Sequence, residues 1–206
     1  DDNGMLDLRT LNEELIQRDL DKHVEKQLVT SLGDLPRTRA FFGRETELEN
    51  ICALLDARSS CLLVPGIAGI GKTALAGKVI EQYTHRRNLL YHRCQDWEGS
   101  RAFLEACAEW LSAIGDDDLS DYIQATAVPQ ASVAVNLIVD ALEEVPALVV
   151  IDDLHKVNDE VLFAIIRGLS QRLDNTQECG LVMFSRSFRA VVPLKDADGN
   201  ISALVL

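Results

Sequence analysis

The sequence predicts an α/β fold in which a mostly parallel central sheet lies between layers of helices. The first observation is that short, uninterrupted apolar runs alternate with longer segments whose apolar residues recur every three or four positions. Such runs are typical of parallel strands covered on both faces, and the longer period is typical of helices. The second observation is that one apolar run leads through a glycine-rich turn directly into a helical segment.

Residues 1–37 are expected to form an N-terminal helix and a linker ahead of the α/β domain. Apolar residues spaced mostly three or four apart predict an amphipathic helix over residues 6–32, and Pro36 within GDLPRTR marks the linker. The helix is expected to act as a tether to a further domain or as a strut against the core, and the strut is the simpler interpretation. The α/β domain itself is expected over residues 38–206.

Within residues 38–206, periodicity and turn residues predict the individual elements. Helices are predicted within residues 41–58, 72–83, 100–115, 131–145 and 158–173. Strands are predicted over residues 60–64, 88–94, 147–152 and 180–185, with a further one at 190–192. The segment DDDLSD, residues 116–121, is expected to be a polar loop.

Composition and charge argue against several classes of protein. No apolar stretch approaches the ~20 residues of a membrane-spanning helix, so no membrane association is expected. The net charge is −13, and the small basic cluster at residues 85–87 is too short to follow a nucleic-acid backbone, so this segment is not expected to bind nucleic acid. The five cysteines form no CxxC pair and are expected to be reduced, structural thiols of a cytoplasmic protein.

The glycine-rich turn carries the strongest functional signal in the sequence. Residues 66–73 match G-x-x-x-x-G-K-[ST] at every fixed position, between a predicted strand and a predicted helix. Backbone N–H groups of such a loop surround phosphate oxygens, and the positive end of the following helix dipole points at them. The residues expected to bind a nucleotide here are Gly66, Ile67, Ala68, Gly69, Ile70, Gly71, Lys72, Thr73 and Ala74.

Within this loop we expect Lys72 to reach the β- and γ-phosphates and the Thr73 hydroxyl to hold Mg²⁺. A solvated lysine on a simple glycine turn is the weaker interpretation.

A second motif, LVVIDD, ends a predicted strand with two acidic residues, the first of them 80 residues after Lys72. We expect Asp152 to coordinate Mg²⁺ and Asp153 to orient or deprotonate the attacking water. A turn or helix N-cap is the alternative for either acid.

Other features narrow the type of nucleotide-binding protein. No NKxD motif is present, which disfavours a GTPase, and Arg101 is the only basic residue over 95–146, which disfavours the arginine-rich lid of a small-molecule kinase. The ordered motifs FFGRETELENI (41–51), the loop at 66–73, VVIDDLHKVNDE (149–160) and LVMFSRS (181–187) resemble the STAND class of signalling P-loop ATPases, which is NB-ARC-like and AAA+-related. The resemblance covers roughly residues 38–192.

The resemblance implies a three-layer P-loop NTPase fold of the ASCE/AAA+-like type, with ATP or ADP and Mg²⁺ as ligands. It places Phe41, Phe42 and Arg44 near adenine and ribose, and Arg186, or Ser185 beside it, near the γ-phosphate as a catalytic sensor. The open alternatives are core packing for the phenylalanines and a solvated charge for either arginine.

Two further points follow from the same motifs. His155 is expected to cap or pack at a helix start rather than to take part in chemistry. The lid and winged-helix region of the class does not follow before Leu206, so the ATPase domain is expected to be truncated, with other domains of a longer chain or partner proteins attached.

The leading functional hypothesis is a regulatory ATP/ADP switch. The second acid of the strand-end motif is Asp153, where active AAA+ motors have glutamate. This difference predicts slow hydrolysis, because the shorter side chain positions water less well. Nucleotide-dependent self-association is a further expectation. The alternatives are an AAA+-like motor with fast turnover and a protein-interaction module that nucleotide merely stabilises.

Overall fold

The computed structural model describes residues 28–36, 41–57, 61–143, 145–173, 178–186 and, for the backbone alone, 201–203. Within these residues the strands form one sheet in the spatial order β1-β3-β4-β5-β2-β6, and each neighbouring pair runs parallel. The strands are β1 (Thr30–Ser31), β2 (Cys61–Pro65), β3 (Asn88–Arg93), β4 (Ala147–Asp152), β5 (Cys179–Ser185) and β6 (Ile201–Ala203). This sheet confirms the predicted fold class.

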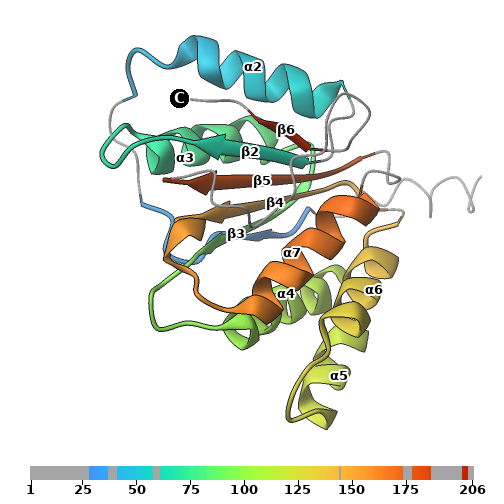
Figure 1. Ribbon diagram of the computed structural model, residues 1–206. Helices are drawn as coiled ribbons and strands as arrows, with labels where there is room; N and C mark the ends of the chain where they lie inside the picture. The colour runs from blue at the N-terminus through green and yellow to red at the C-terminus, as the bar shows by residue number, and fades with distance from the viewer. Residues whose placement is uncertain are drawn as a thin grey trace, which may run out of the picture.

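Helices cover both faces of the sheet, which gives the predicted three layers (Figure 1). One face carries α2 (Glu45–Asp56) and α3 (Lys72–Tyr83). The other carries α4 (Ser100–Ile114), α6 (Ala131–Ala141) and α7 (Glu160–Arg172), with α5 (Asp118–Ala125) packed on α4 and α6. A short 3-10 turn, η1 (Leu154–Lys156), connects β4 to the segment before α7. Among the described residues, no helix combines the length and apolar character that a membrane span requires.

The inner strands are buried on both faces, which explains why they are continuous apolar runs in the sequence. Along β4, Leu148 and Val150 belong to the core cluster beneath α2 and α3, whereas Val149 and Ile151 belong to the cluster beneath α4, α6 and α7. Successive side chains of a strand point to opposite faces, so the sheet divides the core into two parts.

Parallel pairing brings the carboxyl ends of the strands to one edge of the sheet. Pro65 at the end of β2 pairs with Ser185 at the end of β5, and Arg93 at the end of β3 pairs with Asp152 at the end of β4. The residues that follow these strand ends are therefore neighbours in space although they are far apart in the sequence. Ligand sites of open α/β sheets lie at this edge.

The first turns of α4 and α7 share one carboxylate. Asp159 Oδ1 accepts hydrogen bonds from the amides of Val161 (2.8 Å) and Leu162 (3.0 Å), which caps α7. Its Oδ2 accepts a hydrogen bond from the amide of Ser100 at 2.6 Å, at the start of α4. Burial raises the pKa of Asp159, but these N–H groups outweigh it and leave the pKa below its ordinary value.

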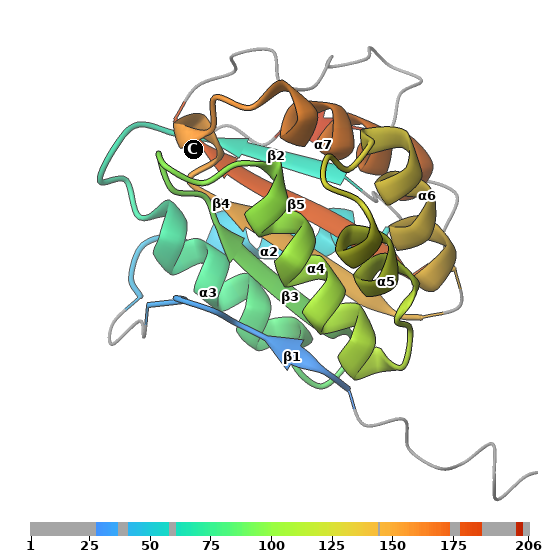
Figure 2. The same cartoon turned by 90° about the horizontal axis from the view of Figure 1, so that it is seen from below.

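The prediction that a helix spans residues 6–32 is wrong at its C-terminal end. Thr30 and Ser31 form β1, which lies beside β3 at the edge of the sheet (Figure 2). The Val29 amide donates to Asn88 Oδ1 at 2.8 Å, and Asn88 Nδ2 donates to Pro146 O at 3.0 Å, so sheet contacts replace helical hydrogen bonds here. Residues 6–27 of that prediction lie outside the described residues.

The polar loop predicted at residues 116–121 is also wrong in part, because α5 begins at Asp118. Leu119 and Ile123, one turn apart, are buried, and the acidic residues of the first turn interact favourably with the helix dipole. The neighbouring α6 ends at Ala141 rather than at residue 145. At the C-terminus, β6 was not predicted, and the strand predicted at residues 190–192 lies outside the described residues.

Candidate nucleotide-binding site

The glycine-rich loop connects the end of β2 to the start of α3. Gly69 and Gly71 have φ angles of 76° and 95°, in the left-handed region where any side chain is strained, so glycine is required at both positions. Gly71 directly precedes the first helical residue of α3. At the other end of the loop, the amide of Gly66 donates to Ser185 O at 3.0 Å, which holds the loop against β5.

Lys72 lies inside the curve of this loop and is only 7% exposed. Its Nζ donates to Gly66 O at 2.7 Å and to Ile67 O at 3.0 Å. Burial lowers the pKa of Lys72, while the nearby carboxylates Asp152 and Asp153 oppose that shift. An ammonium group held by loop carbonyls beside the backbone amides of the loop has the chemistry to receive a phosphate oxygen.

Asp152, at the end of β4, is fully buried and accepts three hydrogen bonds. Thr73 Oγ1 donates to its Oδ2 at 2.6 Å, and Tyr91 Oη donates to the same oxygen at 3.1 Å. The amide of Asp153 donates to Asp152 Oδ1 at 2.8 Å. A hydroxyl and a carboxylate are the hard oxygen ligands that Mg²⁺ prefers alongside phosphate and water, so Thr73 and Asp152 together fit that ion.

Sequence reasoning missed Tyr91. Burial, and then the charge and hydrogen bond of Asp152, raise the pKa of its hydroxyl, so Tyr91 remains a proton donor to the carboxylate at neutral pH. The only sequence signal was a hydroxyl on the strand that neighbours the acidic motif, and it becomes informative once the β3–β4 register is known.

Lys72 and Thr73 line a cavity of about 320 Å³, here called the P-loop cavity. Its lining residues come from the loop, from the start of α3, from the end of β3 and from the segments that follow β4 and β5; they are Ala68, Gly69, Gly71, Lys72, Thr73, Ala74, Arg93, Asp153, Lys156 and Arg186. Among the described residues, four basic side chains and one acidic side chain line it, in a chain of net charge −13. The cavity therefore concentrates positive charge where an anion would lie.

Comparison with known proteins agrees with this geometry. Residues 40–183 match the family described as AAA ATPase domain. The chain belongs to that family. AAA ATPase domains bind nucleotide and usually Mg²⁺, which is the chemistry that the loop, Lys72, Thr73 and Asp152 fit. No curated protein gives a significant match to the chain.

Solved structures share the fold of this AAA ATPase domain. Cdc6p from Pyrobaculum aerophilum is 20% identical with a TM-score of 0.56, over 84% of this chain and 47% of that chain. The Aeropyrum pernix Orc1 protein in complex with DNA is 20% identical with a TM-score of 0.55, over 82% and 46%. Drosophila ORC bound to AT-rich DNA and Cdc6 is 15% identical with a TM-score of 0.54, over 78% and 52%. The matched part is about half the length of each of these solved chains.

In this AAA ATPase domain Asp153 is paired with two cations, Arg93 and Lys156, which we call the Asp153 cluster. Arg93 Nε and Nη2 each lie 3.0 Å from Asp153 Oδ2, and Lys156 Nζ lies 3.0 Å from the same oxygen. Burial raises the pKa of Asp153, but the hydrogen bonds and charges of Lys156 and Arg93 outweigh it and leave the pKa lowered. Asp153 also has φ 55°, a conformation rare for a non-glycine residue.

Sequence reasoning missed both cations of the Asp153 cluster. Lys156 is three residues after Asp153, a spacing that brings side chains together in a helical turn, and this signal was present in the sequence. Arg93 could not be found in the same way, because only the strand register places it opposite Asp152.

The residues predicted to lie near adenine and ribose are only partly brought to the site. Arg44 Nε is 4.0 Å from the position that a Cβ on Gly71 would take, so this side chain borders the loop while pairing with Glu47 at 3.1 Å. Phe41 is partly buried and packs against the core cluster beneath α2 and α3. Phe42 is 86% exposed and is not among the residues that line the P-loop cavity.

At the end of β5, the two candidate sensor residues differ in position. Arg186 is exposed and lines the P-loop cavity, whereas Ser185 is buried and its carbonyl anchors the loop. His155 lies in η1, partly buried, and its Nδ1 is enclosed without a hydrogen-bond partner among the described residues. Burial, and then the charge of Arg186, lower the pKa of His155, so its ring is neutral at pH 7.

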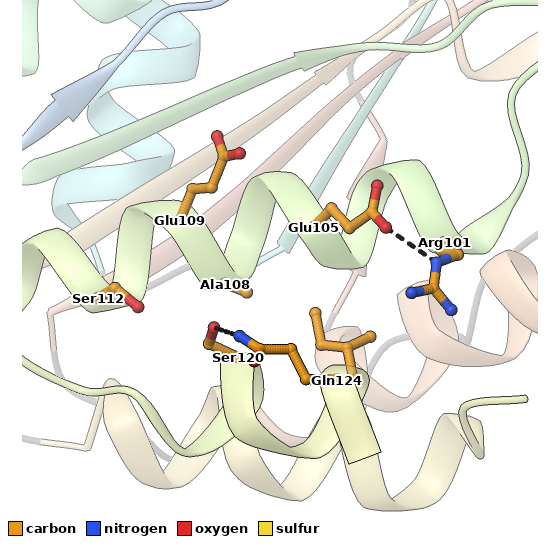
Figure 3. A pocket seen from close by; sticks show the side chains of 8 residues that line it. Arg101, Glu105, Ala108, Glu109, Ser112, Ser120 and Gln124 are labelled. Atoms are coloured by element: carbon orange, nitrogen blue, oxygen red, sulfur yellow. Dashed lines mark hydrogen bonds and ion pairs between the residues drawn. The ribbon is translucent and has the colours of Figure 1, made fainter. Parts of the chain in front are cut away.

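A second cavity of about 460 Å³ lies between α4 and α5 and is here called the α4–α5 cavity (Figure 3). In Figure 3, Glu105 and Glu109 project from α4, and Arg101 is paired with Glu105 at 2.8 Å. From α5, Gln124 donates to Ser120 at 3.1 Å. The lining carries two carboxylates and one guanidinium, and no glycine-rich loop borders it, which makes it a poor place for a phosphate.

Proposed function

We propose that this AAA ATPase domain is the nucleotide switch of a STAND-class regulatory protein, which binds ATP or ADP with Mg²⁺ and hydrolyses ATP slowly. The observation that carries the proposal is the direct 2.6 Å hydrogen bond between Thr73 of the loop and Asp152 of β4, beside a buried Lys72. It joins the two nucleotide motifs of the sequence in one cavity.

The proposed roles follow from where each side chain lies. The loop amides and Lys72 would bind the β- and γ-phosphates, and Thr73 with Asp152 would hold Mg²⁺, which neutralises phosphate charge during transfer. Arg186, which is exposed and lines the cavity, would contact the γ-phosphate, and Arg44 would lie on the base and ribose side of the loop. Phe42 is exposed and does not line the cavity, so it would contact adenine only if the base lay against its solvent-facing ring.

The Asp153 cluster supports slow turnover. A general base works best when its pKa lies near the operating pH, and the two cations move the pKa of Asp153 in the opposite direction. The paired carboxylate is therefore better suited to orient water than to deprotonate it. Slow hydrolysis sets the lifetime of the ATP state, which is the property that a switch requires.

The remaining parts of the proposal concern the whole protein. Because the chain spans about half the length of the solved chains it resembles, further domains or partner proteins would respond to the nucleotide, and nucleotide-dependent self-association is one such response. The five cysteines, without disulfides in the described structure, support a cytoplasmic location. The DNA named with the solved structures belongs to those proteins, and the net charge of −13 gives no support for it here.

The test measures binding and turnover together. ATP and ADP are titrated with Mg²⁺ by calorimetry, and phosphate release is followed for the wild type, for Lys72→Ala and for Lys78→Ala. Lys78 lies on the same helix, paired with Glu81 outside the P-loop cavity, and is the matched control. We expect binding to be lost only in Lys72→Ala and turnover to lie well below ~1 s⁻¹.

Three other results would change the proposal. Turnover of ten or more per second would favour the motor alternative. Absence of binding in a wild-type chain that unfolds cooperatively would contradict nucleotide binding by this segment. Retained ADP that never exchanges would favour a module that nucleotide merely stabilises.

A further inference from the structure

We propose that Lys156, in addition to Arg186, lets this site distinguish a nucleoside triphosphate from a diphosphate. In this inference Lys156 leaves Asp153 when a triphosphate binds and pairs with the terminal phosphate. The inference rests on the proposed function, because it concerns the same P-loop cavity.

The position of Lys156 is the first step of the argument. It is the last residue of η1, the turn that directly follows Asp153, and it lines the P-loop cavity without belonging to the glycine loop. Its side chain is 22% exposed, so the ammonium is largely withdrawn from water and faces the cavity. A cation in that position interacts strongly with an incoming anion.

The second step is that Asp153 does not depend on Lys156. Arg93 contacts the same carboxylate oxygen through both Nε and Nη2, so Asp153 keeps a charged partner when Lys156 leaves. Arg93 meets the carboxylate with two atoms of a rigid, planar guanidinium, a hydrogen bond from Nε and an ion pair from Nη2, whereas a lysine ammonium is a point charge on a flexible stem. Lys156 is therefore the cation that can be exchanged.

The third step compares Lys156 with the other basic residues of the cavity. Lys72 is held by the carbonyls of Gly66 and Ile67 within the loop. In the proposed function it binds both the β- and the γ-phosphate, so it does not select for the γ-phosphate. Arg186 is exposed and its charge is more strongly screened by solvent. Lys156 lines the cavity from outside the loop and shares its carboxylate with Arg93, so we expect it to be the cation that responds to charge added at the end of the phosphate chain.

The experiment compares Lys156→Gln with Lys78→Gln. Lys78 is also paired with an acid at a spacing of three residues, Glu81 at 2.5 Å, but it lies away from the cavity. ADP and a non-hydrolysable imido analogue of ATP are titrated with Mg²⁺ by calorimetry. In Lys156→Gln we expect roughly 10-fold weaker binding of the analogue, the effect of losing one charged hydrogen bond, and ADP affinity within about 2-fold of the wild type.

Further variants decide between this role and a structural one. Lys156→Arg should keep most of the preference for the analogue, Lys78→Gln should keep all of it, and melting temperatures show whether each variant is folded. Equal losses for both nucleotides, or no loss for either, in folded Lys156→Gln would overturn the inference while leaving the proposed function intact. Failure of the wild type to bind either nucleotide would overturn both.

Discussion

The P-loop cavity and the α4–α5 cavity are similar in size but differ in what they can bind. The α4–α5 cavity is the larger, about 460 Å³ against about 320 Å³, yet its lining is acidic and includes no glycine-rich loop. The P-loop cavity lies where parallel strands end, with four basic side chains and a helix start directed into it. Charge and backbone geometry, rather than volume, therefore identify the functional cavity in this domain.

The largest expected effect on ATP binding comes from replacing a glycine of the P-loop cavity, compared with replacing a glycine at the end of α4. Gly71 in the loop and Gly115 at the end of α4 both have positive φ angles, 95° and 107°. Replacing either by alanine introduces about 1–3 kcal/mol of backbone strain. We expect Gly71→Ala to weaken ATP binding by roughly 10–100-fold, because strain shifts the loop amides, and Gly115→Ala to lower stability alone.

Calorimetry and thermal melting of both glycine variants test this expectation. Equal ATP affinity in Gly71→Ala and Gly115→Ala would contradict the assignment of the loop as the binding element.

A smaller effect is expected at Asp159, which holds the first turns of both α4 and α7 and lies outside both cavities. Losing this cap in Asp159→Ala should lower the free energy of unfolding by about 1–2 kcal/mol at pH 7, while Asp159→Asn should lose less. Because the folded pKa of Asp159 is lowered, its contribution is complete above the unfolded pKa near ~3.9 and falls as the pH drops through that value.

Denaturant unfolding at pH 7 and near pH 3.5 measures the effect of the cap. The difference between wild type and Asp159→Ala should shrink at the lower pH. A difference that grows on acidification would show that the charged cap is not what stabilises these helix starts.

The smallest effect is expected from a pair of tyrosines. Tyr91 donates to Asp152 at 3.1 Å beside the P-loop cavity, whereas Tyr122 on α5 accepts from the amide of Gln130 at 2.8 Å. We expect Tyr91→Phe to weaken Mg²⁺-dependent ATP binding by about 5-fold, since one hydrogen bond is worth about 1 kcal/mol, and Tyr122→Phe to leave it unchanged. Titration of ATP at several Mg²⁺ concentrations checks this; an identical Mg²⁺ dependence in the two variants would be the contrary result.

The sequence predicted the parts of this domain that depend on local chemistry. The loop at 66–73 and the strand ending in Asp152 were found because glycine positions and a buried acid leave a fixed spacing in the chain. Arg93 and Tyr91 were not found, because their role depends on the register between β3 and β4, which no local pattern specifies. The α5 helix was missed because three consecutive aspartates resemble a loop, although the last of them, Asp118, lies with Asp121 in the first turn of the helix and stabilises it.

The structure tests the predicted helices and strands more fully than the predicted functions of individual residues. The fold class is confirmed, whereas the boundary near residue 37 and the functions of all the predicted site residues, those of the loop, Asp152 and Asp153 included, stay predictions.

The shared carboxylate of Asp159 has a mechanical consequence. A helix whose first turn is held by a side chain from another segment cannot be displaced without that segment. Asp159 follows Asp153 by six residues, so a rotation of the turn around Lys156 would be transmitted to α7 and, through the Ser100 amide, to α4. The outer surface of α4 would then move when the nucleotide changes, although it lies far from the phosphates along the chain.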